Sequence, residues 1–312
     1  MSAILVRNLS IIIPTYNRAP ILAKVLRAYG SQTAEAGILE ILVADDGSTD
    51  ETAAVVEQFS SKFRFPVRHL RLEHGGLAKT RNSAIREARG ELLLLGDDDI
   101  IPAPHFVAEH LAWHEKYPDL HDGVLGRVVL SSELRPTAFM VWLHDEMLFN
   151  FSSSPSGLLD PPSYLFGITS VKREFLLQNG MFDEDFKEYG FEDIELGHRL
   201  SKVGYRVFYN PAAVGYHYKK MSLAYAWRHA ELVETARPHF LAKIEANEMI
   251  APRPETATRK TLRKLVQAVM PFFSPVIWLF DTPIPLPRFV YRLFYLQYIL
   301  PRVRAGLSAA SR

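Results

Sequence analysis

The chain of 312 residues contains no cysteine and has almost no net charge, because 36 Lys and Arg residues are balanced by 35 Asp and Glu. Without cysteine, a disulfide scaffold and any thiolate site for zinc or an iron–sulfur cluster are excluded. Apolar residues make up 48% of the chain, too many for a disordered polymer. The charge balance predicts no nucleic-acid partner, and the absence of cysteine fits a reducing compartment, so we predict a cytoplasmic protein.

Long apolar runs are also missing. The longest apolar stretch, residues 265–280, is interrupted by two prolines and a glutamine. It is shorter than the roughly 18 continuous apolar residues that a membrane-spanning helix needs. The N-terminus lacks the basic start and the small-residue cleavage site of a signal peptide. We therefore predict neither a membrane span nor a targeting segment.

The balanced total hides an uneven distribution of charge. Residues 253–312 contain ten basic and two acidic side chains, a balance of +8, whereas residues 1–252 have a balance of −7. An acidic globular body is thus followed by a basic tail, and each needs its own explanation.

Four apolar runs in the first hundred residues predict buried strands, at Leu9–Ile13, Ile38–Ala44, Val67–Leu72 and Glu91–Leu95. Their spacing leaves room for a crossover helix after each strand. Helical periodicity predicts a helix that ends at Gly30, a second that follows a capping box at 48–51, and a third that stops at Gly90. The predicted fold class is α/β, a Rossmann-like, mostly parallel sheet flanked by helices, whose strands end at one edge.

Polar residues follow three of these strands. Residues 14–18 (PTYNR) follow the first strand, Asp45 and Asp46 follow the second, and residues 97–99 (DDD) follow the fourth. Ligands of open α/β sheets bind in the crevice at the carboxyl ends of the strands, so these segments predict one shared site. No G-x-G-x-x-G follows a strand and no G-x-x-x-x-G-K-[ST] occurs, so a dinucleotide dehydrogenase and a P-loop protein have no support.

The run Asp97, Asp98 and Asp99 is the strongest chemical signal. Three adjacent carboxylates at the end of an apolar strand repel one another and are costly to desolvate. A divalent cation such as Mg²⁺ removes that cost. The alternative is a solvated turn that caps the following helix. His110 and His114 have i,i+4 spacing but no zinc-protease Glu between them, so we interpret them as surface or packing residues.

Four segments resemble the family 2 glycosyltransferases with the GT-A fold, in the order of that family: SIIIPTYNR (10–18), ILVADDGSTDET (41–52), GGLAKTRNSAIREARGELLLLGDDD (75–99) and FDEDFKEYGFEDIELGHRL (182–200). The resemblance implies a GT-A catalytic domain over residues 1–220, with a nucleotide-binding half at 1–100 and an acceptor half at 101–220. Residues 221–312 then form a basic, aromatic and mostly helical extension.

The resemblance implies a nucleotide-diphosphate sugar donor. The residues at matching donor-site positions are Pro14, Thr15, Tyr16, Asn17, Arg18, Asp46, Arg81 and Asp97. A carboxylate only accepts hydrogen bonds, so Asp46 suits an N–H of the base, which uracil, thymine and guanine all offer. The alternatives are that Asp46 caps the helix after Ser48 and that Arg81 lies on a solvated helix face.

The resemblance also implies a Mg²⁺ or Mn²⁺ ion at the acidic motif. Asp98 is the best candidate ligand, Asp99 lies beside it, and His217 matches a further contact to the metal or the diphosphate. Asp97 is expected to approach the ribose or the metal. The commoner family pattern has Asp at the first position of this motif, where this chain has Gly96.

The pair Glu192 and Asp193 matches the E-D pair of the family, whose Asp is the catalytic base. Glycosyl transfer with inversion needs a base on the sugar face opposite the leaving nucleotide. The N-terminus of a helix keeps such a carboxylate ionised and ready to accept a proton. The alternative is ordinary acidic charge at the start of a helix.

These features predict a metal-dependent inverting glycosyltransferase that moves a sugar to a hydroxyl of a glycan or a lipid-linked acceptor. A nucleotidyltransferase is one alternative, but such enzymes usually have a Gly-rich basic loop where this chain has PTYNR. The other alternative is a catalytically inactive nucleotide-sugar-binding partner protein, which the altered Gly96 position keeps open.

In the tail, basic and aromatic side chains interleave: Arg288, Arg292, Arg302 and Arg304 with Phe289, Tyr291, Phe294, Tyr295 and Tyr298. This composition is typical of a helix on an anionic membrane surface, so we predict peripheral contact with the inner face of the membrane. The alternatives are packing of C-terminal helices and a homodimer interface.

Overall fold

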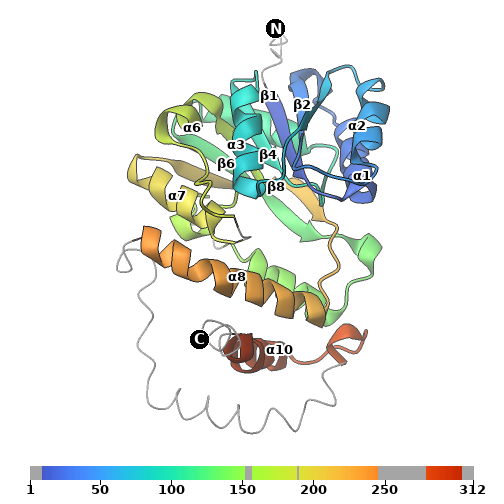
Figure 1. The fold of residues 1–312 in the computed structure, drawn as a ribbon, viewed down its shortest axis with the longest axis vertical. Coiled ribbons are helices and arrows are strands. Elements are labelled where there is room, and N and C mark those ends of the chain that lie inside the picture. Colours follow the sequence, from blue (N-terminus) through green and yellow to red (C-terminus); the bar gives the residue numbers. More distant parts are fainter. Residues whose placement is uncertain (1–8, 152–156, 188–189, 245–278, 304–312) are drawn as a thin grey trace. The chain divides into compact units, whose positions relative to one another are not determined.

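A computed structural model describes residues 9–151, 157–187, 190–244 and 279–303 (Figure 1). The chain divides into two compact units. The first contains residues 1–129, 151–187 and 192–218, and the second contains residues 130–150, 188–191 and 219–312. The segment 130–150 therefore groups with the C-terminal part of the chain rather than with the sequence that precedes it.

The first unit is built on an eight-stranded sheet in the order β3-β2-β1-β4-β7-β6-β8-β5. The strands are β1 (Leu9–Thr15), β2 (Ile38–Asp45), β3 (Val67–Arg71), β4 (Leu92–Gly96), β5 (Ile100–Pro102), β6 (Asp122–Leu130), β7 (Ile168–Lys172) and β8 (Arg206–His217). The first four pair in parallel, while β7 pairs antiparallel with β4 and β6, and β5 pairs antiparallel with β8. The predicted α/β class with a mostly parallel sheet is confirmed, and the four predicted strands correspond to β1–β4.

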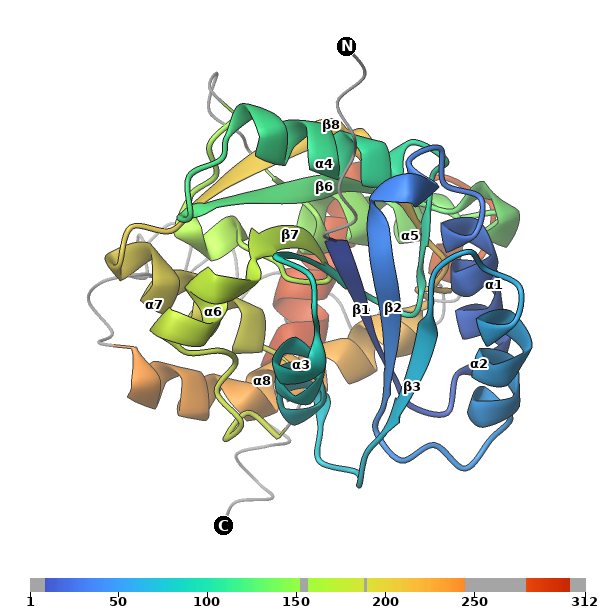
Figure 2. The ribbon, with the colours of Figure 1, turned by 90° about the horizontal axis from the view of Figure 1, so that it is seen from above.

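The helices of this unit lie on both faces of the sheet. They are α1 (Ala19–Tyr29), α2 (Thr52–Ser60), α3 (Leu77–Glu87), α4 (Phe106–Lys116), α6 (Arg173–Asn179) and α7 (Glu192–Lys202), with short 3₁₀ turns at Glu35–Gly37 and Pro161–Ser163. The chain runs outward from β1 to β3 and returns to place β4 on the other side of β1. Because crossovers are right-handed, this reversal puts α3 on the face opposite α1 and α2 (Figure 2).

The second helix starts differently from the predicted capping box at 48–51. Its first residue is Thr52, and the side chain of the N-cap residue Glu51 makes no capping hydrogen bond. Asp50 accepts the N–H of Thr52 at 3.0 Å through Oδ1 and the N–H of Ala19 at 3.0 Å through Oδ2. The hydroxyl of Ser48 instead accepts the N–H of Asn17 at 2.9 Å. The capping box was therefore a wrong prediction, because these polar side chains join the loops after β1 and β2.

In its described residues, the second unit is mostly helical. It contains α5 (Ala138–Trp142) with a π-helical turn (Leu143–Leu148), a 3₁₀ turn (Ser132–Leu134), α8 (Leu223–Lys243) and α10 (Arg288–Phe294) with a second π-helical turn (Tyr295–Ile299). Its hydrophobic core includes Phe139 and Trp142 from α5 and Tyr291 and Phe294 from α10. Among the described residues, none of the helices combines the length and the apolar composition that a membrane span requires.

Among the described residues of the tail, several aromatic side chains belong to the core. Tyr291 and Phe294 are each 1% exposed and Tyr295 is 6% exposed, whereas Phe289 is 65% exposed. Side chains that are buried in this way are not available to a membrane surface. Their burial favours the packing alternative within this unit, while Arg304 lies outside the described residues.

Candidate active site

The candidate site lies where the strand order reverses, between β1 and β4. Parallel pairing of these strands matches Ile12 with Leu95, so the segments that follow them leave the sheet side by side. Thr15, the last residue of β1, donates its hydroxyl to Oδ2 of Asp98 at 2.7 Å. This bond joins two of the three polar segments that the sequence singled out, at the place where open α/β sheets bind ligands.

Gly96 ends β4 directly before the three aspartates. A Cβ atom at this position would lie 3.2 Å from the hydroxyl oxygen of Tyr29 and 3.5 Å from the carbonyl oxygen of Ile12. These distances leave little room for a side chain. The crowding by Tyr29 gives a physical reason why the chain has glycine where aspartate is commoner.

Asp98 and Asp99 are buried and share one cation. Nη1 of Arg18 lies 2.7 Å from Oδ1 of Asp98, and Nη2 lies 3.0 Å from Oδ2 of Asp99. The two aspartates are 5% and 4% exposed, so the alternative of a solvated turn is wrong. Burial raises the pKa of Asp98 to about 7, and the neighbouring Asp99 also raises it, while Arg18 and Thr15 lower it. The two carboxylates therefore need positive charge to stay ionised together.

His217 reaches this cluster through strand pairing. It is the last residue of β8 and pairs with Ile100 of β5, which directly follows Asp99. Its Nε2 lies 3.7 Å from Oδ2 of Asp99, and the N–H of Tyr218 donates to the carbonyl of Asp99 at 2.7 Å. The imidazole of His217 and the carboxylate of Asp99 thus meet from segments more than a hundred residues apart, and Asp98 is the neighbour of Asp99 in the chain. This donor set suits Mn²⁺ or Mg²⁺, which fill their coordination with carboxylates, phosphate oxygens and water.

Arg81 on α3 joins two further carboxylates. Its Nη1 donates to Oδ1 of Asp193 at 2.8 Å, and its Nη2 donates to Oδ1 of Asp97 at 2.8 Å. Arg81 is 2% exposed, so the alternative of a solvated helix face is wrong. Burial alone would lower the pKa of its guanidinium, but the charges of Asp193 and Asp97 outweigh burial and raise that pKa.

Asp193 stands in the first turn of α7 with both carboxylate oxygens bonded. Oδ1 accepts from Arg81, and Oδ2 accepts the backbone N–H of Phe166 at 3.0 Å. Burial raises the pKa of Asp193 above its usual range, against the lowering by Arg81 and by the N–H of Phe166. Glu192, the first residue of α7, is 6% exposed. A raised pKa brings a carboxylate closer to the value that suits a general base near neutral pH.

Asp46 is held at the start of α3. It accepts the backbone N–H groups of Gly75 and Gly76 at 2.8 and 3.1 Å, and Nδ1 of His74 lies 2.8 Å from its Oδ2. Gly76 is the N-cap residue of α3, so the carboxylate lies at the positive end of that helix. The alternative that Asp46 caps α2 is wrong, because α2 begins at Thr52 without it.

Tyr16 and Asn17 continue from β1 beside this group. The ring of Tyr16, which is 44% exposed, stacks on the ring of His74 with 4.5 Å between centroids. Asn17 has a φ of 53°, a left-handed conformation that asparagine tolerates better than most residues. Its Oδ1 accepts the N–H of Thr49 at 2.8 Å, which ties the loop after β1 to the loop after β2. Pro14 is buried inside β1.

Several groups at this site were not predicted from the sequence. The N–H of Phe166 on Asp193 and the N–H groups of Gly75 and Gly76 on Asp46 are backbone donors, whose positions no sequence pattern reveals. His74 gave no signal because one histidine in a loop matches no motif. Gly167 was also not predicted. A Cβ atom there would lie 2.1 Å from Oδ2 of Asp97, so a side chain at this position would collide with that carboxylate.

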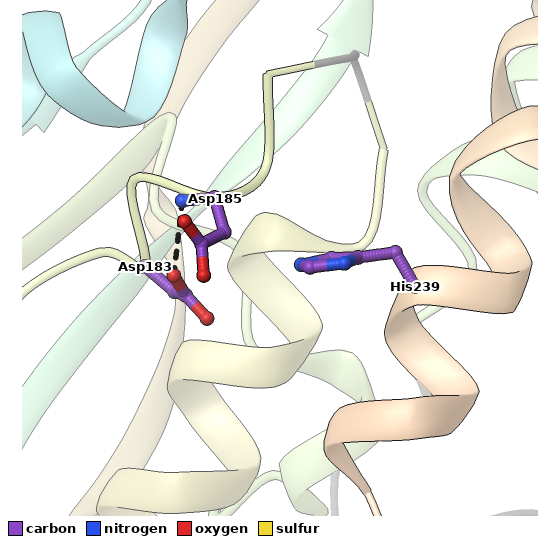
Figure 3. A group of neighbouring side chains, drawn as sticks. All are labelled: Asp183, Asp185 and His239. Carbon is purple, nitrogen blue, oxygen red and sulfur yellow. Dashed lines mark hydrogen bonds between the residues drawn. The ribbon is translucent and has the colours of Figure 1, made fainter.

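A further acidic pair lies in the first unit on the loop that precedes α7. The N–H of Asp185 donates to Oδ1 of Asp183 at 3.0 Å, the bond drawn in Figure 3. His239, drawn in the same figure, belongs to α8 of the second unit. The bond between Asp183 and Asp185 closes the turn locally.

The family model described as Glycosyl transferase family 2 matches residues 10–176. The chain therefore belongs to this family, as the four sequence segments predicted. It is 28% identical over 241 residues to the uncharacterized glycosyltransferase YfnE of Bacillus subtilis (strain 168), which covers 62% of this chain and 60% of that protein.

The chain is also 31% identical over 222 residues to validoxylamine A glucosyltransferase of Streptomyces hygroscopicus subsp. jinggangensis (strain 5008), over 63% of this chain and 52% of that protein. The matched region thus covers between 52% and 60% of the length of these two relatives.

Solved structures share the fold. Mannosyltransferase PcManGT from Pyrobaculum calidifontis, in complex with GDP-Man and Mn²⁺, superposes with a TM-score of 0.56 at 22% identity and covers 97% of this chain and 75% of that one. TarS 1-349 of S. aureus in complex with UDP gives a TM-score of 0.55 at 18% identity, over 96% of this chain and 92% of that one. These similarities confirm a GT-A-like fold.

Proposed function

We propose that this protein is a metal-dependent inverting glycosyltransferase that uses a nucleotide-diphosphate sugar. The observation that carries the proposal is the gathering of Asp97, Asp98 and Asp99 with Asp193 at one sheet edge, where two arginines pair with all four carboxylates. Membership of the glycosyltransferase family supports it independently. A nucleotidyltransferase has no comparable support.

Asp193 is the proposed general base. The acceptor hydroxyl transfers its proton to the carboxylate of Asp193 while its oxygen attacks the anomeric carbon. The bond from that carbon to the diphosphate oxygen breaks, and its electron pair leaves with the nucleoside diphosphate. Attack from the face opposite the leaving group inverts the anomeric centre. Glu192 supplies a second carboxylate at the start of the same helix, whose N-terminus favours negative charge.

Asp98, Asp99 and His217 are the residues that would hold a divalent ion. Two buried carboxylates that share one partly exposed arginine fit such an ion, because a second positive charge would keep both ionised. When bound, Mg²⁺ or Mn²⁺ neutralises the negative charge that develops on the departing diphosphate. Among the solved relatives, the mannosyltransferase is in complex with GDP-Man and Mn²⁺, which supports the same choice of cofactor here.

The donor is proposed to lie along the loops after β1, β2 and β4. Tyr16, stacked on His74, offers an aromatic surface at the place where Asp46 can accept an N–H from the base. Uracil and guanine both have such an N–H, and the complexes of the relatives contain UDP-GlcNAc or GDP-Man. The proposed acceptor is a hydroxyl of a glycan or of a lipid-linked glycan.

The first experiment is a thermal-unfolding panel of UDP, GDP and dTDP, each with EDTA or with Mn²⁺. We expect one nucleoside diphosphate to raise the midpoint of unfolding only when Mn²⁺ is present. The second experiment measures Mn²⁺-dependent hydrolysis of UDP-GlcNAc and GDP-mannose, in which water replaces the acceptor. Binding without any turnover of donor would instead support a catalytically inactive sugar-binding protein, and no binding at all would overturn the proposal.

A further inference from the structure

Arg81 is a charged side chain at a buried position. It lies on α3 with its neighbours Ala78 and Ile85, which are 1% and 0% exposed, and is itself 2% exposed. Removing a guanidinium from water is costly, and in a buried site the cost must be offset by carboxylates that pair with it. Arg81 meets that condition twice, with Asp193 on one side and Asp97 on the other.

The orientation of the guanidinium is fixed by the residues that surround it. Its central carbon lies 5.1 Å from the ring centroid of Phe182. Phe182 is itself fixed by Asn82, the residue after Arg81, whose side chain donates to the carbonyl of Phe182 at 2.8 Å and accepts its N–H at 2.9 Å. The same turn of α3 therefore supplies the arginine and fixes the ring that covers it.

This arrangement controls how the carboxylate of Asp193 points. Oδ1 is tied to Arg81 at 2.8 Å and Oδ2 to the N–H of Phe166 at 3.0 Å, so the plane of the carboxylate has two independent anchors. The other terminal nitrogen of Arg81 is tied to Asp97, whose side chain is 35% exposed and follows β4 next to Asp98.

We infer that Arg81 is a positioning residue, which orients the base Asp193 and links it to the donor-side carboxylate of Asp97. The inference rests on the proposed function, because it assigns Asp193 the role of base. Arg81 is predicted to act on the base itself, which is a different role from the donor-site contact that the family resemblance implies.

The two charged neighbours Arg81 and Asp97 shift the pKa of Asp193 in opposite directions. Four groups surround Asp193. They are Arg81 of α3, Asp97 after β4, the N–H of Phe166 before β7, and the adjacent residue Glu192 on α7. Arg81 lowers the pKa of Asp193, whereas Asp97 raises it. Removing the positive partner and removing the negative partner must therefore shift the ionisation of Asp193 in opposite directions.

The test is a carboxyl ¹³C NMR titration of Asp-labelled protein, with the Asp193 signal assigned from Asp193→Asn. We expect Arg81→Gln to raise the titration midpoint of Asp193 by about 1 to 3 pH units, and Asp97→Asn to lower it by about one. Arg86→Gln is the matched control, because Arg86 is on the same helix with a side chain that is 53% exposed. Should Arg81→Gln fail to fold, Asp97→Asn carries the test alone. The inference is overturned if the titration midpoint of Asp193 equals the wild-type value in Asp97→Asn and, where it folds, in Arg81→Gln.

Arg81→Lys separates positioning from charge. Lysine keeps the positive charge but lacks the planar fork that contacts two carboxylates at once. We expect a titration midpoint near that of the wild type, together with a kcat for donor hydrolysis reduced by about tenfold or more and a little-changed KM. A wild-type kcat in Arg81→Lys would contradict a positioning role. Because the titration needs no turnover, a protein that hydrolyses no donor but shows both midpoint shifts would refute the proposed function and leave the contacts of Arg81 established.

Discussion

His110 and His114 bond to the same hydroxyl: Nδ1 of His110 and Nε2 of His114 each lie 2.8 Å from Oγ of Ser170. Both histidines are on α4, one turn apart, and are 0% and 7% exposed. Of the two interpretations offered from the sequence, surface or packing residues, this burial confirms packing and shows that a surface location is wrong. Their other ring nitrogens have no hydrogen-bond partner among the described residues. Neither ring has a carboxylate partner in these contacts that would stabilise a second proton.

Acid should therefore destabilise the fold through these two residues. Burial lowers the pKa of each histidine to about 3, whereas an unfolded histidine has a pKa of about 6.5. Because the pKa of each histidine is lowered in the folded state, its contribution to the free energy of unfolding is fully present above about pH 6.5. That contribution is lost as the pH falls from there toward about 3. In urea unfolding between pH 8 and 5, we expect His114→Gln to reduce the pH dependence by about 1.4 kcal/mol per pH unit below pH 6. His121→Gln, at a partly exposed position, is the control, and identical slopes in wild type and His114→Gln would contradict this account.

Replacing Arg18 should make the protein more dependent on metal. Arg18→Ala removes the cation shared by Asp98 and Asp99, whose side chains are 7% and 6% exposed. Because the Arg18 side chain itself is 35% exposed, we expect a loss of about 1 to 3 kcal/mol, less than for a fully buried pair. Thermal unfolding with EDTA should show this loss, and Mn²⁺ should raise the midpoint more in Arg18→Ala than in the wild type. Arg27→Ala, exposed on the same helix, should behave as the wild type does. An equal effect of Mn²⁺ on all three proteins would show that the ion does not bind at these aspartates.

Gly167 should tolerate a side chain only when Asp97 is absent. Gly167→Ala would put Cβ 2.1 Å from Oδ2 of Asp97, so Asp97 must move away from Arg81. We expect a loss of about 1 to 3 kcal/mol from this overpacking. In the Asp97→Ala background, the same substitution should cost much less, and a double-mutant cycle by urea unfolding measures the difference. Additive effects would mean that Asp97 and Gly167 do not compete for space.

The tail aromatics should differ in their contributions to stability. Phe294 is 1% exposed in the core of the second unit, whereas Phe289 on the same helix is 65% exposed. We expect Phe294→Ala to cost about 3 to 5 kcal/mol of unfolding free energy and Phe289→Ala to stay within about 0.5 kcal/mol. Urea unfolding of both variants measures this. Equal costs would show that α10 does not pack as described.

Much of the first unit follows directly from its sequence. The four apolar runs predicted β1 to β4 because strands covered on both faces are continuously apolar, and polar residues after those strands marked the site. The strands β5 to β8 were not predicted. The apolar run of β6 was overlooked, although it is at least as apolar as the run of β3. β5 is three residues long, so only its pairing with β8 makes it a strand.

The sequence predicted which residues belong to the site, but not which of them pair with one another. The burial of Arg81 was within reach, because Ala78, Arg81 and Ile85 share one face of α3 at helical spacing. Its two carboxylate partners were not, since Asp193 is more than a hundred residues away in sequence. Likewise, Asp46 was identified as an acceptor, but the N–H groups that hold it depend on where Gly75 and Gly76 fall at the start of α3.

The most direct measurement of the central claim is Mn²⁺-dependent donor hydrolysis by Asp193→Asn, run beside isothermal titration with the nucleoside diphosphate that the wild type prefers. Asparagine keeps the size of the side chain but accepts no proton. We expect the hydrolysis rate to fall by about 10² to 10⁴-fold while the affinity for the nucleoside diphosphate with Mn²⁺ stays at the wild-type value. Undiminished hydrolysis by Asp193→Asn would contradict the account.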